Sequence, residues 1–412
     1  MTDRKVDYLL IGGGLAAGNC ARWLRESGAD GSILLVGREP DLPYNRPPCS
    51  KGYLQGTESR EDTLFRPPGW FEEQQIEVLT RTSAMKLDLA ERTVKLSNRS
   101  VVSFGQALLA TGANVRRLNV PGCELEGIHY LRTLGNSDAI REDASGKRVV
   151  LIGGSYIASE VAASLTERGS TCTMVMIEPV ALSRGFGEQA GRFFQSALQE
   201  HGITVHGADE LERLEGRDGR VTRVITKSGL ELEADAVVIG AGAVPDVTLA
   251  RGAGLELGDS GGVAVDSRLQ TSVPGVYAAG DIAQYDSVVN GGRSIRVEHW
   301  DVAFNHGKTA ALNMLGQDAA HDLVPYFFSD LSDWASLEYV GPAYEWDREV
   351  VRGSLDDGEF TIFYLHGARL AGALSVGRSD DLDAARRLIS SEADLIGSVD
   401  ALGDLSSDLS QL

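Results

Sequence analysis

Three side chains capable of chemistry stand close together in residues 42–52, which read LPYNRPPCSKG. They are Arg46, Cys49 and Lys51. The prolines and the glycine exclude a long helix, so this segment is expected to be a constrained turn. A cysteine two residues from a lysine can be a thiolate of low pKa. It can equally be a small apolar residue that fills a gap in a core.

A glycine-rich turn follows the first apolar strand. Residues 6–11, VDYLLI, run directly into GGGLAAG, and we expect a helix over 16–27 and a second strand over 32–36. The turn positions are Gly12, Gly14 and Ala17. Such a turn can serve helix–strand packing alone, but the strand–turn–helix–strand order points the helix N-terminus at a pyrophosphate. The pattern therefore predicts a dinucleotide site.

The same arrangement recurs near the middle of the chain. Residues 148–152, RVVLI, lead into GGSYIASE, then a helix and a strand over 171–177. Glu178 ends that strand, where a carboxylate can bind both ribose hydroxyls, although it can also be a solvated strand end. Neither Arg nor Lys immediately follows Glu178 to bind a 2′-phosphate, so the pattern favours NADH over NADPH. Ser155 replaces the middle glycine of the turn, and its effect on NADH affinity is left open.

A third stretch, VPGVYAAGD, reads as a buried strand that ends in Gly-Asp at Asp281. A carboxylate at this position can hold the polyol of a second half of a ligand, or simply cap a helix. Two dinucleotide units of different register suggest one flavin and one nicotinamide cofactor. Residues 359–365 and 370–376 have antiparallel character and flank a short turn, which predicts a hairpin.

Composition narrows the class of protein. The chain has 412 residues and a formal net charge of −20, which opposes nonspecific binding to nucleic acid or to an anionic membrane. Two or three domains are the natural expectation for this length. The four cysteines are scattered without a CxxC pair, which argues against a disulfide scaffold or a zinc site. No apolar run is long enough for a signal peptide or a membrane span, so we expect a cytoplasmic protein.

Seven motifs together resemble one family. GGGLAAG, LPYNRPPCSK, LLATGA, GGSYIASE, GAGAVP, VYAAGDIA and RVEHWDVAFNHG occur in the order found in pyridine-nucleotide flavoprotein reductases. More narrowly, the chain resembles NADH-dependent ferredoxin and rubredoxin reductases and apoptosis-inducing-factor-like flavoproteins. The resemblance covers nearly the whole chain.

The resemblance implies an α/β fold with two Rossmann-like dinucleotide-binding domains, for FAD and for NAD, and a C-terminal α+β domain. The FAD-binding domain is expected to be discontinuous, with the NAD-binding domain inserted into it. The expected boundaries are 1–115 and 246–325 for FAD, 116–245 for NAD, and 326–412 for the C-terminal domain. A helix is expected near 381–391, and the acidic, serine-rich tail after about residue 400 is expected to fray.

The resemblance also implies roles for individual residues. Lys51 and Glu160 would form an ion pair beside the flavin N5, where the ammonium stabilises the charge of the reduced ring. The other residues expected to contact FAD are Gly12, Gly14, Ala17, Glu39, Arg46, Thr111, Gly112, Asp281, His299, Trp300 and Phe328. Those expected to contact NAD are Gly153, Ser155, Tyr156, Ile157, Glu160, Glu178 and Gly242.

Some of these assignments are more specific. Arg46 would contact the pyrophosphate and Asp281 the ribitol, while His299 and Trp300 would pack near the isoalloxazine and Phe328 would close its other edge. Relatives usually carry an acidic residue where this chain has Arg38, so Glu39 is expected to take the ribose role, with Arg38 lying over the adenine.

Cys49 departs from the closest groups, which usually carry leucine there. More distant NADH peroxidases and coenzyme A-disulfide reductases place a redox cysteine at about this position. The first glycine-rich helix lacks the histidine that accompanies such a cysteine in the peroxidases, and the flanking RPP and SK belong to the ferredoxin-reductase pattern. We expect Cys49 to be a packing residue, with redox activity as the alternative.

The expected function is transfer of electrons from NADH through FAD to a small iron–sulfur or rubredoxin-type protein, by a monomer or a homodimer. The overall acidity opposes an acidic partner unless a local basic patch exists, for instance at Arg116 and Arg117 or at Arg293 and Arg296. The alternatives are a slow redox-sensing flavoprotein with a stable charge-transfer complex, or a peroxidase or disulfide reductase that uses Cys49. The identity of the acceptor is left open.

Overall fold

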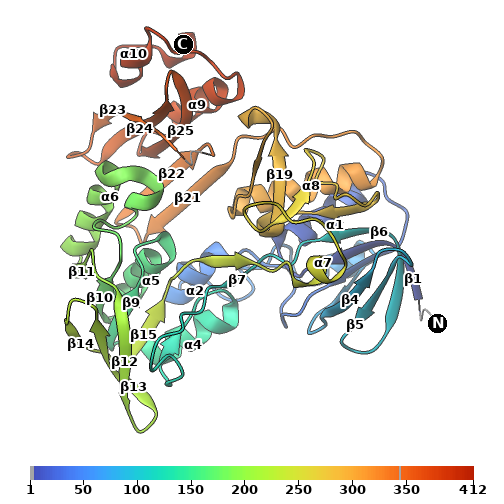
Figure 1. Cartoon of the computed structure of the whole chain (residues 1–412), viewed down its shortest axis with the longest axis horizontal. Coiled ribbons are helices and arrows are strands. Elements are labelled where there is room, and N and C mark those ends of the chain that lie inside the picture. The colour runs from blue at the N-terminus through green and yellow to red at the C-terminus, as the bar shows by residue number, and fades with distance from the viewer. Residues whose placement is uncertain (1–3, 343–344) are drawn as a thin grey trace.

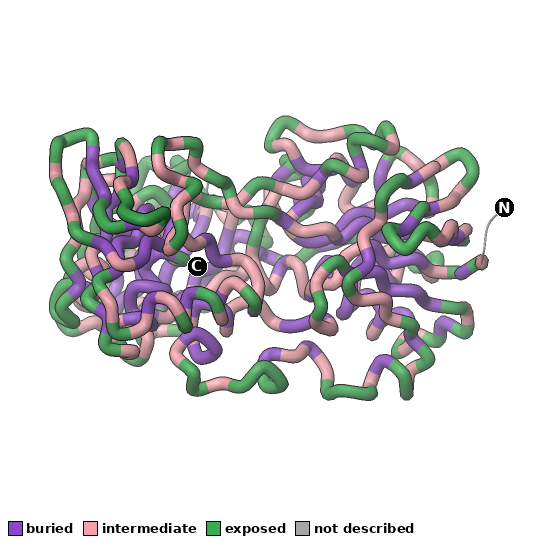
Figure 2. Tube along the Cα trace, turned by 90° about the horizontal axis from the view of Figure 1, so that it is seen from below, coloured by how far each residue is buried: buried purple, intermediate pink, exposed green. Residues whose placement is uncertain are grey.

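The computed structural model describes residues 4–342 and 345–412. Figure 1 shows a large sheet at the end of the molecule that carries the N-terminus, with a second parallel sheet and the C-terminal sheet at the opposite end. Seen along another direction, the buried residues gather in separate cores at these two ends (Figure 2). No helix in the described part of the chain is long and apolar enough to cross a membrane.

The first sheet has seven strands in the order β3-β2-β1-β6-β5-β4, and β18 pairs with β6. The strands are β1 (Arg4–Ile11), β2 (Ile33–Val36), β3 (Ile76–Leu79), β4 (Ala84–Asp88), β5 (Thr93–Leu96), β6 (Val101–Leu109) and β18 (Val276–Ala278). Two helices, α1 (Leu15–Glu26) and α8 (Trp300–Met314), pack together beside it. Because β18 joins this sheet long after the chain has left β6, the first unit is built from two separate stretches of sequence.

The second sheet has five parallel strands in the order β11-β10-β9-β15-β8. They are β8 (Ile128–His129), β9 (Arg148–Ile152), β10 (Thr171–Val175), β11 (Thr204–His206) and β15 (Ala236–Ile239). Its helices are α4 (Leu134–Ala144), α5 (Tyr156–Glu167) and α6 (Ser183–Glu200), and an antiparallel sheet of β12 (Leu211–Arg217), β13 (Arg220–Thr226) and β14 (Glu231–Glu233) lies beside it. Continuous apolar strands such as RVVLI are typical of a parallel sheet that is covered on both faces.

The chain crosses between the first and second units twice, and the two crossings pair with each other. Strands β7 (Ala113–Val115) and β16 (Ala243–Pro245) are antiparallel, with Val115 opposite Ala243. We propose the boundaries 1–115, 116–245, 246–325 and 326–412 on this basis.

The segment that carries Arg46, Cys49 and Lys51 packs into the core of the second unit. It forms a short 3₁₀ helix, η1 (Pro47–Ser50), followed by one helical turn, α2 (Gly52–Gln55), as its prolines predict. Cys49 and Leu54 are buried in one cluster with Leu134 and Leu151 of the second unit. This segment therefore ties the first unit to the second.

The C-terminal sheet is antiparallel, in the order β21-β22-β25-β24-β23. Its strands are β21 (Tyr326–Leu331), β22 (Ala335–Val340), β23 (Arg348–Ser354), β24 (Glu359–His366) and β25 (Arg369–Val376), followed by α9 (Asp380–Ser390). The expected hairpin of residues 359–365 and 370–376 is present as β24 and β25. Smaller elements complete the fold: α3 (Trp70–Glu73), α7 (Thr248–Gly252), β17 (Val263–Val265), η2 (Gly280–Ile282), β19 (Ala283–Ser287), η3 (Val288–Asn290) and β20 (Arg293–Ile295).

The prediction of a frayed tail was wrong. The tail forms α10 (Val399–Gly403) and η4 (Leu409–Gln411). Leu402 and Leu409 are buried in the core that also holds α9. Arg352 donates a hydrogen bond to the Ser407 carbonyl, and Arg387 donates one to the Leu409 carbonyl. Backbone carbonyls of the tail are therefore bonded within the fold, although the serine-rich composition suggested that water would solvate them.

Candidate functional site

A cavity of about 1050 Å³ lies where the three parts of the chain meet. Both glycine-rich turns, the η1 segment and the strands β21 and β22 line it. Most of the predicted site residues face it: Gly12, Gly14, Glu39, Arg46, Lys51, Thr111, Gly112, Ser155, Tyr156, Ile157, Glu160, Gly242, Asp281, His299, Trp300 and Phe328. The other three lie elsewhere. Ala17 is fully buried in the first core, Gly153 opens the second turn against the Gly240 carbonyl, and Glu178 lies behind that turn.

Lys51 and Glu160 form an ion pair at the cavity, with the Lys51 Nζ 2.7 Å from a carboxylate oxygen. The Glu160 carboxylate also accepts hydrogen bonds from the hydroxyls of Ser50, at 2.5 Å, and Ser329, at 2.6 Å. Its side chain is only 5% exposed. Three donors therefore hold this buried carboxylate, and the cost of burying its charge is offset.

The partners of Glu160 come from all three parts of the fold. Ser50 and Lys51 belong to the η1 turn, Glu160 lies on α5, and Ser329 lies on β21. The Lys51 ammonium also lies 3.3 Å from the Asp330 carbonyl and 5.9 Å from the centre of the Phe328 ring. These contacts fix the position of the ammonium at the point where the domains join. The two serines carried no sequence signal, since neither spacing nor composition marks them.

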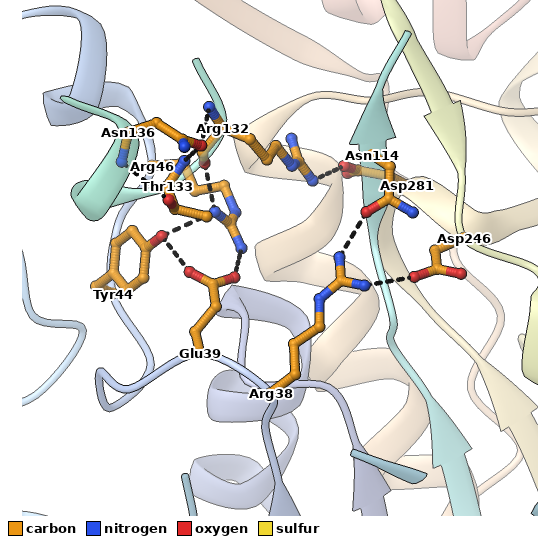
Figure 3. Close-up of polar contacts among 10 residues, drawn as sticks. All are labelled: Arg38, Glu39, Tyr44, Arg46, Asn114, Arg132, Thr133, Asn136, Asp246 and Asp281. Atoms are coloured by element: carbon orange, nitrogen blue, oxygen red, sulfur yellow. Dashed lines mark hydrogen bonds and ion pairs between the residues drawn. The ribbon is translucent and has the colours of Figure 1, made fainter. Parts of the chain in front are cut away.

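A second network surrounds Glu39 (Figure 3). The Arg46 guanidinium and the Tyr44 hydroxyl each donate a hydrogen bond of 2.6 Å to the Glu39 carboxylate. Burial opposes ionisation of Glu39, but the charge of Arg46 and these hydrogen bonds outweigh it and lower its pKa. Glu39 is therefore ionised and already bonded to Arg46, the residue expected to contact the pyrophosphate.

Arg132 is a cavity residue that the sequence did not reveal. Its guanidinium lies 2.8 Å from the Asp281 carboxylate, and its backbone carbonyl accepts a hydrogen bond from Arg46. The Arg132 Nε is buried without a hydrogen-bond partner among the described residues. A half-buried guanidinium with an unpartnered Nε, lining the same cavity as the first glycine-rich turn, suits a bound phosphate group.

Arg38, which follows β2, makes two contacts with side chains near the crossings between the first and second units (Figure 3). It donates to Asp246 at 2.9 Å and to the Asn114 side chain at 2.6 Å. Arg38 lines the cavity, and the idea that it covers the adenine stays a prediction.

The first turn has the shape of a cradle. Gly12 has φ of 138°, and a Cβ there would lie 2.0 Å from the Ala110 carbonyl oxygen, so only glycine fits. A Cβ on Gly14 would meet no protein atom within 4 Å and would fill cavity space instead. The helix α1 begins at Leu15, directly after this open position, and no side chain caps it. The residues therefore fit a bound dinucleotide diphosphate.

The second turn repeats this geometry with one difference. Gly153 has φ of 125°, and its Cβ position would lie 2.4 Å from the Gly240 carbonyl oxygen. Ser155 precedes α5, makes no capping hydrogen bond with its side chain and lines the cavity. Its hydroxyl is therefore available to a ligand. The Glu178 carboxylate lies behind this turn, 3.2 Å from the Cβ position of Gly154.

Aromatic rings close one side of the cavity. Phe327 lies 4.7 Å from Tyr156 and 4.9 Å from His299, measured between ring centres. The Trp300 indole donates a hydrogen bond to the Asn45 side chain. Burial lowers the pKa of His299 to about 4, so this ring is neutral near pH 7. Phe327 was not among the predicted residues, although its neighbour Phe328 was.

Cys49 is 3% exposed, although it borders the cavity. Burial raises the pKa of its thiol to about 12, against the opposing effect of Arg46. The thiolate is the reactive form of cysteine, so this environment favours the packing role over the redox role. All four cysteines are free thiols.

Two parallel-sheet units whose glycine-rich turns open into one cavity define a dinucleotide-binding oxidoreductase. The chain belongs to the pyridine nucleotide-disulphide oxidoreductase family, whose model matches residues 6–307, and a reductase C-terminal model matches residues 326–412. This membership implies use of a flavin and of a pyridine nucleotide. The predicted family and fold class are confirmed.

Two curated relatives match over almost their whole length, and a third matches over part of its length. A rhodocoxin reductase of Rhodococcus erythropolis is 35% identical, over 95% of this chain and 91% of that protein. A ferredoxin–NAD(P)+ reductase of Sphingomonas sp. is 33% identical over 95% of both chains. Human apoptosis-inducing factor 3 is 31% identical over 90% of this chain and 60% of its own length.

Solved structures agree with these relatives. A ferredoxin reductase from Rhodopseudomonas palustris superposes with a TM-score of 0.92 at 32% identity, covering 100% of this chain and 99% of that one. The covalent complex of putidaredoxin reductase with putidaredoxin gives a TM-score of 0.92 at 30% identity, covering 100% of this chain and 98% of that one.

Proposed function

We propose that this chain is an FAD-dependent NADH oxidoreductase that passes electrons to a small carrier protein of the ferredoxin or rubredoxin type. The Lys51–Glu160 ion pair carries the proposal, because it fixes a positive charge in a cavity that both glycine-rich turns enter. The relatives named as reductases of ferredoxin and of rhodocoxin support the class of acceptor.

A bound flavin accepts two electrons from a nicotinamide as hydride and can release them one at a time. The protein supplies position and charge. The Lys51 ammonium can stabilise negative charge in the cavity, and Glu160 orients it. The hydroxyls of Ser50 and Ser329 donate hydrogen bonds that fix Glu160 in turn. The rings of Tyr156 and Phe327, which contact each other, line the same cavity as this ion pair.

The nucleotide preference is proposed to be NADH. Glu178 lies beside the second turn, where a carboxylate favours two ribose hydroxyls and repels a 2′-phosphate. Arg184, on α6, also faces the cavity and is the cation best placed to favour NADPH instead. Comparing kcat/KM for NADH and NADPH tests this assignment, and a preference for NADPH would overturn it.

A titration with NADH under anaerobic conditions tests the proposal. Complete bleaching of the flavin absorbance at about one NADH per FAD is expected, because no second two-electron centre is proposed. A requirement for about two equivalents would instead assign a redox role to Cys49. The reduced protein should then pass electrons to a ferredoxin or a rubredoxin within its turnover time.

A redox-sensing role is the second candidate, favoured by the similarity to apoptosis-inducing factor 3. In that case reoxidation by air would take minutes or longer, and the protein would change size on addition of NADH. Size-exclusion chromatography with and without NADH separates the two functions and reports whether the protein is a monomer or a homodimer.

A further inference from the structure

The turn that leads to Lys51 is held by serine hydroxyls of the second unit. Ser137, on α4, donates a hydrogen bond of 2.8 Å to the carbonyl of Cys49. Ser164, on α5, donates one of 2.6 Å to the carbonyl of Ser50. These two carbonyls directly precede Lys51, and both donors are at most 1% exposed. The backbone before Lys51 is therefore fixed to two helices of another unit.

The ion-pair partner of Lys51 is held in a similar way from the C-terminal sheet. Ser329, on β21, donates to Oε1 of Glu160, the same oxygen that accepts from the Lys51 ammonium. Ser50 donates to the other oxygen, Oε2. Both serines are buried, so water has little access to replace either donor. Loss of one hydroxyl would leave a buried carboxylate oxygen with one partner fewer.

The hairpin of β21 and β22 is anchored on the second unit. Trp334, in the turn between these strands, donates a hydrogen bond of 3.0 Å to Glu167. Its ring stacks on that of His201, with centres 4.0 Å apart and planes at 8°. Glu167 ends α5, the helix that carries Glu160, and both α2 and β21 contact this helix (Figure 1). Docking of the hairpin along α5 therefore brings Ser329 to Glu160.

Three of these serines lie outside the cavity. Ser137, Ser164 and Ser329 do not line it, whereas Lys51 and Glu160 do. They can act on a bound group only through the position of the Lys51 ammonium and the Glu160 carboxylate. A change in a bound flavin on loss of these hydroxyls would therefore report a shift of charge rather than a lost contact.

We infer that Ser137, Ser164 and Ser329 are positioning residues, which set the reduction potential of the bound flavin by fixing the ammonium beside it. The inference rests on the proposed function, which places Lys51 next to the flavin ring. Two electrons and one proton convert the neutral oxidised ring into an anionic reduced ring, which a fixed positive charge stabilises. Without the Ser329 hydroxyl, Glu160 would carry a less compensated charge and draw the ammonium away from the cavity. Reduction should then become less favourable.

Domain docking and flavin chemistry are linked in this arrangement. Ser329 belongs to the C-terminal sheet, while Ser137 and Ser164 belong to the second unit. The potential should therefore depend on how both parts pack around the η1 turn. The two groups of serines act on different atoms, so their contributions can be removed separately.

Ser329→Ala and the double variant Ser137→Ala/Ser164→Ala test the inference. The midpoint potential of the bound flavin is measured by anaerobic reduction with xanthine and xanthine oxidase against a reference dye, which needs neither NADH nor a protein acceptor. Ser375→Ala and Ser170→Ala are the matched controls. Each removes a buried serine hydroxyl that hydrogen-bonds the backbone away from the cavity, in the same sheet as Ser329 or in the same unit as the other two.

The flavin of Ser329→Ala is expected to be harder to reduce by about tenfold in the two-electron equilibrium, a shift of about 30 mV to more negative potential. The double variant should shift in the same direction, and both controls should stay within about twofold of the wild type. Ser329→Thr keeps a hydroxyl and should retain the wild-type potential. Ser329→Val has the same shape as Ser329→Thr without the hydroxyl, and it should behave like Ser329→Ala.

An unchanged potential in either alanine variant would overturn the role of the serines that it replaces. Equal shifts in the controls, or in Ser329→Thr and Ser329→Val, would overturn the inference as well, because the hydroxyl would then not be the cause. If Ser329→Ala loses its flavin, the comparison of the threonine and valine variants decides. A wild-type flavin that NADH does not reduce would instead overturn the proposed function, while the potentials would still decide the role of the serines.

Discussion

The Lys51 ammonium and the Glu160 carboxylate meet at 2.7 Å where the end of the η1 turn packs against α5. Neither residue is held by this contact alone, since Ser50 and Ser329 also donate to Glu160. A fully satisfied buried carboxylate is costly to disturb, because loss of a partner leaves charge without compensation. The pair is therefore both a junction between domains and a fixed source of positive charge at the cavity.

Lys51→Met should slow reduction of the flavin by NADH by about 10²-fold, because it removes the charge proposed to stabilise the reduced ring. Stopped-flow absorbance measures this rate. Lys147→Met is the matched control, since Lys147 is paired with Asp143 outside the cavity. Reduction of Lys51→Met at the wild-type rate would rule out the role of Lys51.

Cys49→Ser should leave NADH–ferricyanide turnover within about twofold of the wild type, since burial keeps this thiol protonated. In the native protein at pH 8, a thiol reagent should modify Cys123, which is partly exposed, before it modifies Cys49. Peptide mapping after brief labelling checks the order. Fast labelling of Cys49, or loss of turnover in the serine variant, would support the peroxidase or disulfide-reductase alternative.

Glu178→Ser should narrow the preference for NADH over NADPH by about tenfold or more, because it removes a carboxylate beside the second glycine-rich turn. Steady-state kcat/KM with each nucleotide gives the ratio. Glu212→Ser, on the neighbouring strand β12, serves as the control for loss of one surface carboxylate. An unchanged ratio in Glu178→Ser would show that Glu178 is only a solvated side chain.

Leu402→Ala should lower the free energy of unfolding by about 2–4 kcal/mol, since the side chain is fully buried in the core beneath α9. Leu405→Ala should change it by less than about 0.5 kcal/mol, because Leu405 is 60% exposed. Urea unfolding of both variants provides the comparison. If the two variants were equally stable, the tail would not pack as described.

Stability should fall on acidification because of buried histidines. Burial lowers the pKa of His321 to about 4 and that of His299 to about 4. The unfolded chain therefore binds more protons than the folded one below about pH 6.5, and each such histidine removes about 1.4 kcal/mol per pH unit down to about pH 4. In urea unfolding, the free energy of unfolding of His321→Gln should fall less than that of the wild type between pH 7.5 and pH 5.5, because one buried neutral histidine is gone. The same pH dependence in variant and wild type would contradict the burial of a neutral ring.

The local patterns of the sequence predicted the parts that rest on neighbours in the chain. The strand–turn–helix units around Gly12 and Gly153 and the hairpin of β24 and β25 follow from glycine positions and strand periodicity. The meeting of Lys51 with Glu160 needed the family resemblance, because periodicity does not report which distant segments pack together.

The remaining features depend on tertiary contacts. Arg132 reaches Asp281 only because α4 begins beside the cavity, and nothing near Arg132 in the sequence marks it. The ordered tail was missed because its acidic and serine-rich composition hides the spacing of Leu402 and Leu409.

The pairing of Val115 with Ala243 places the two ends of the second unit side by side. A domain whose two ends are adjacent can be replaced by the matching domain of a relative, because the two connection points in the rest of the chain stay the same distance apart. The segment of residues 47–55 limits which replacements can fold, because it contributes side chains to the core of that domain. Cys49 and Leu54 complete the core of the inserted unit. A chimera that receives residues 116–245 together with residues 47–55 of the same protein should therefore fold, whereas one that receives residues 116–245 alone should pack poorly against the host's own turn.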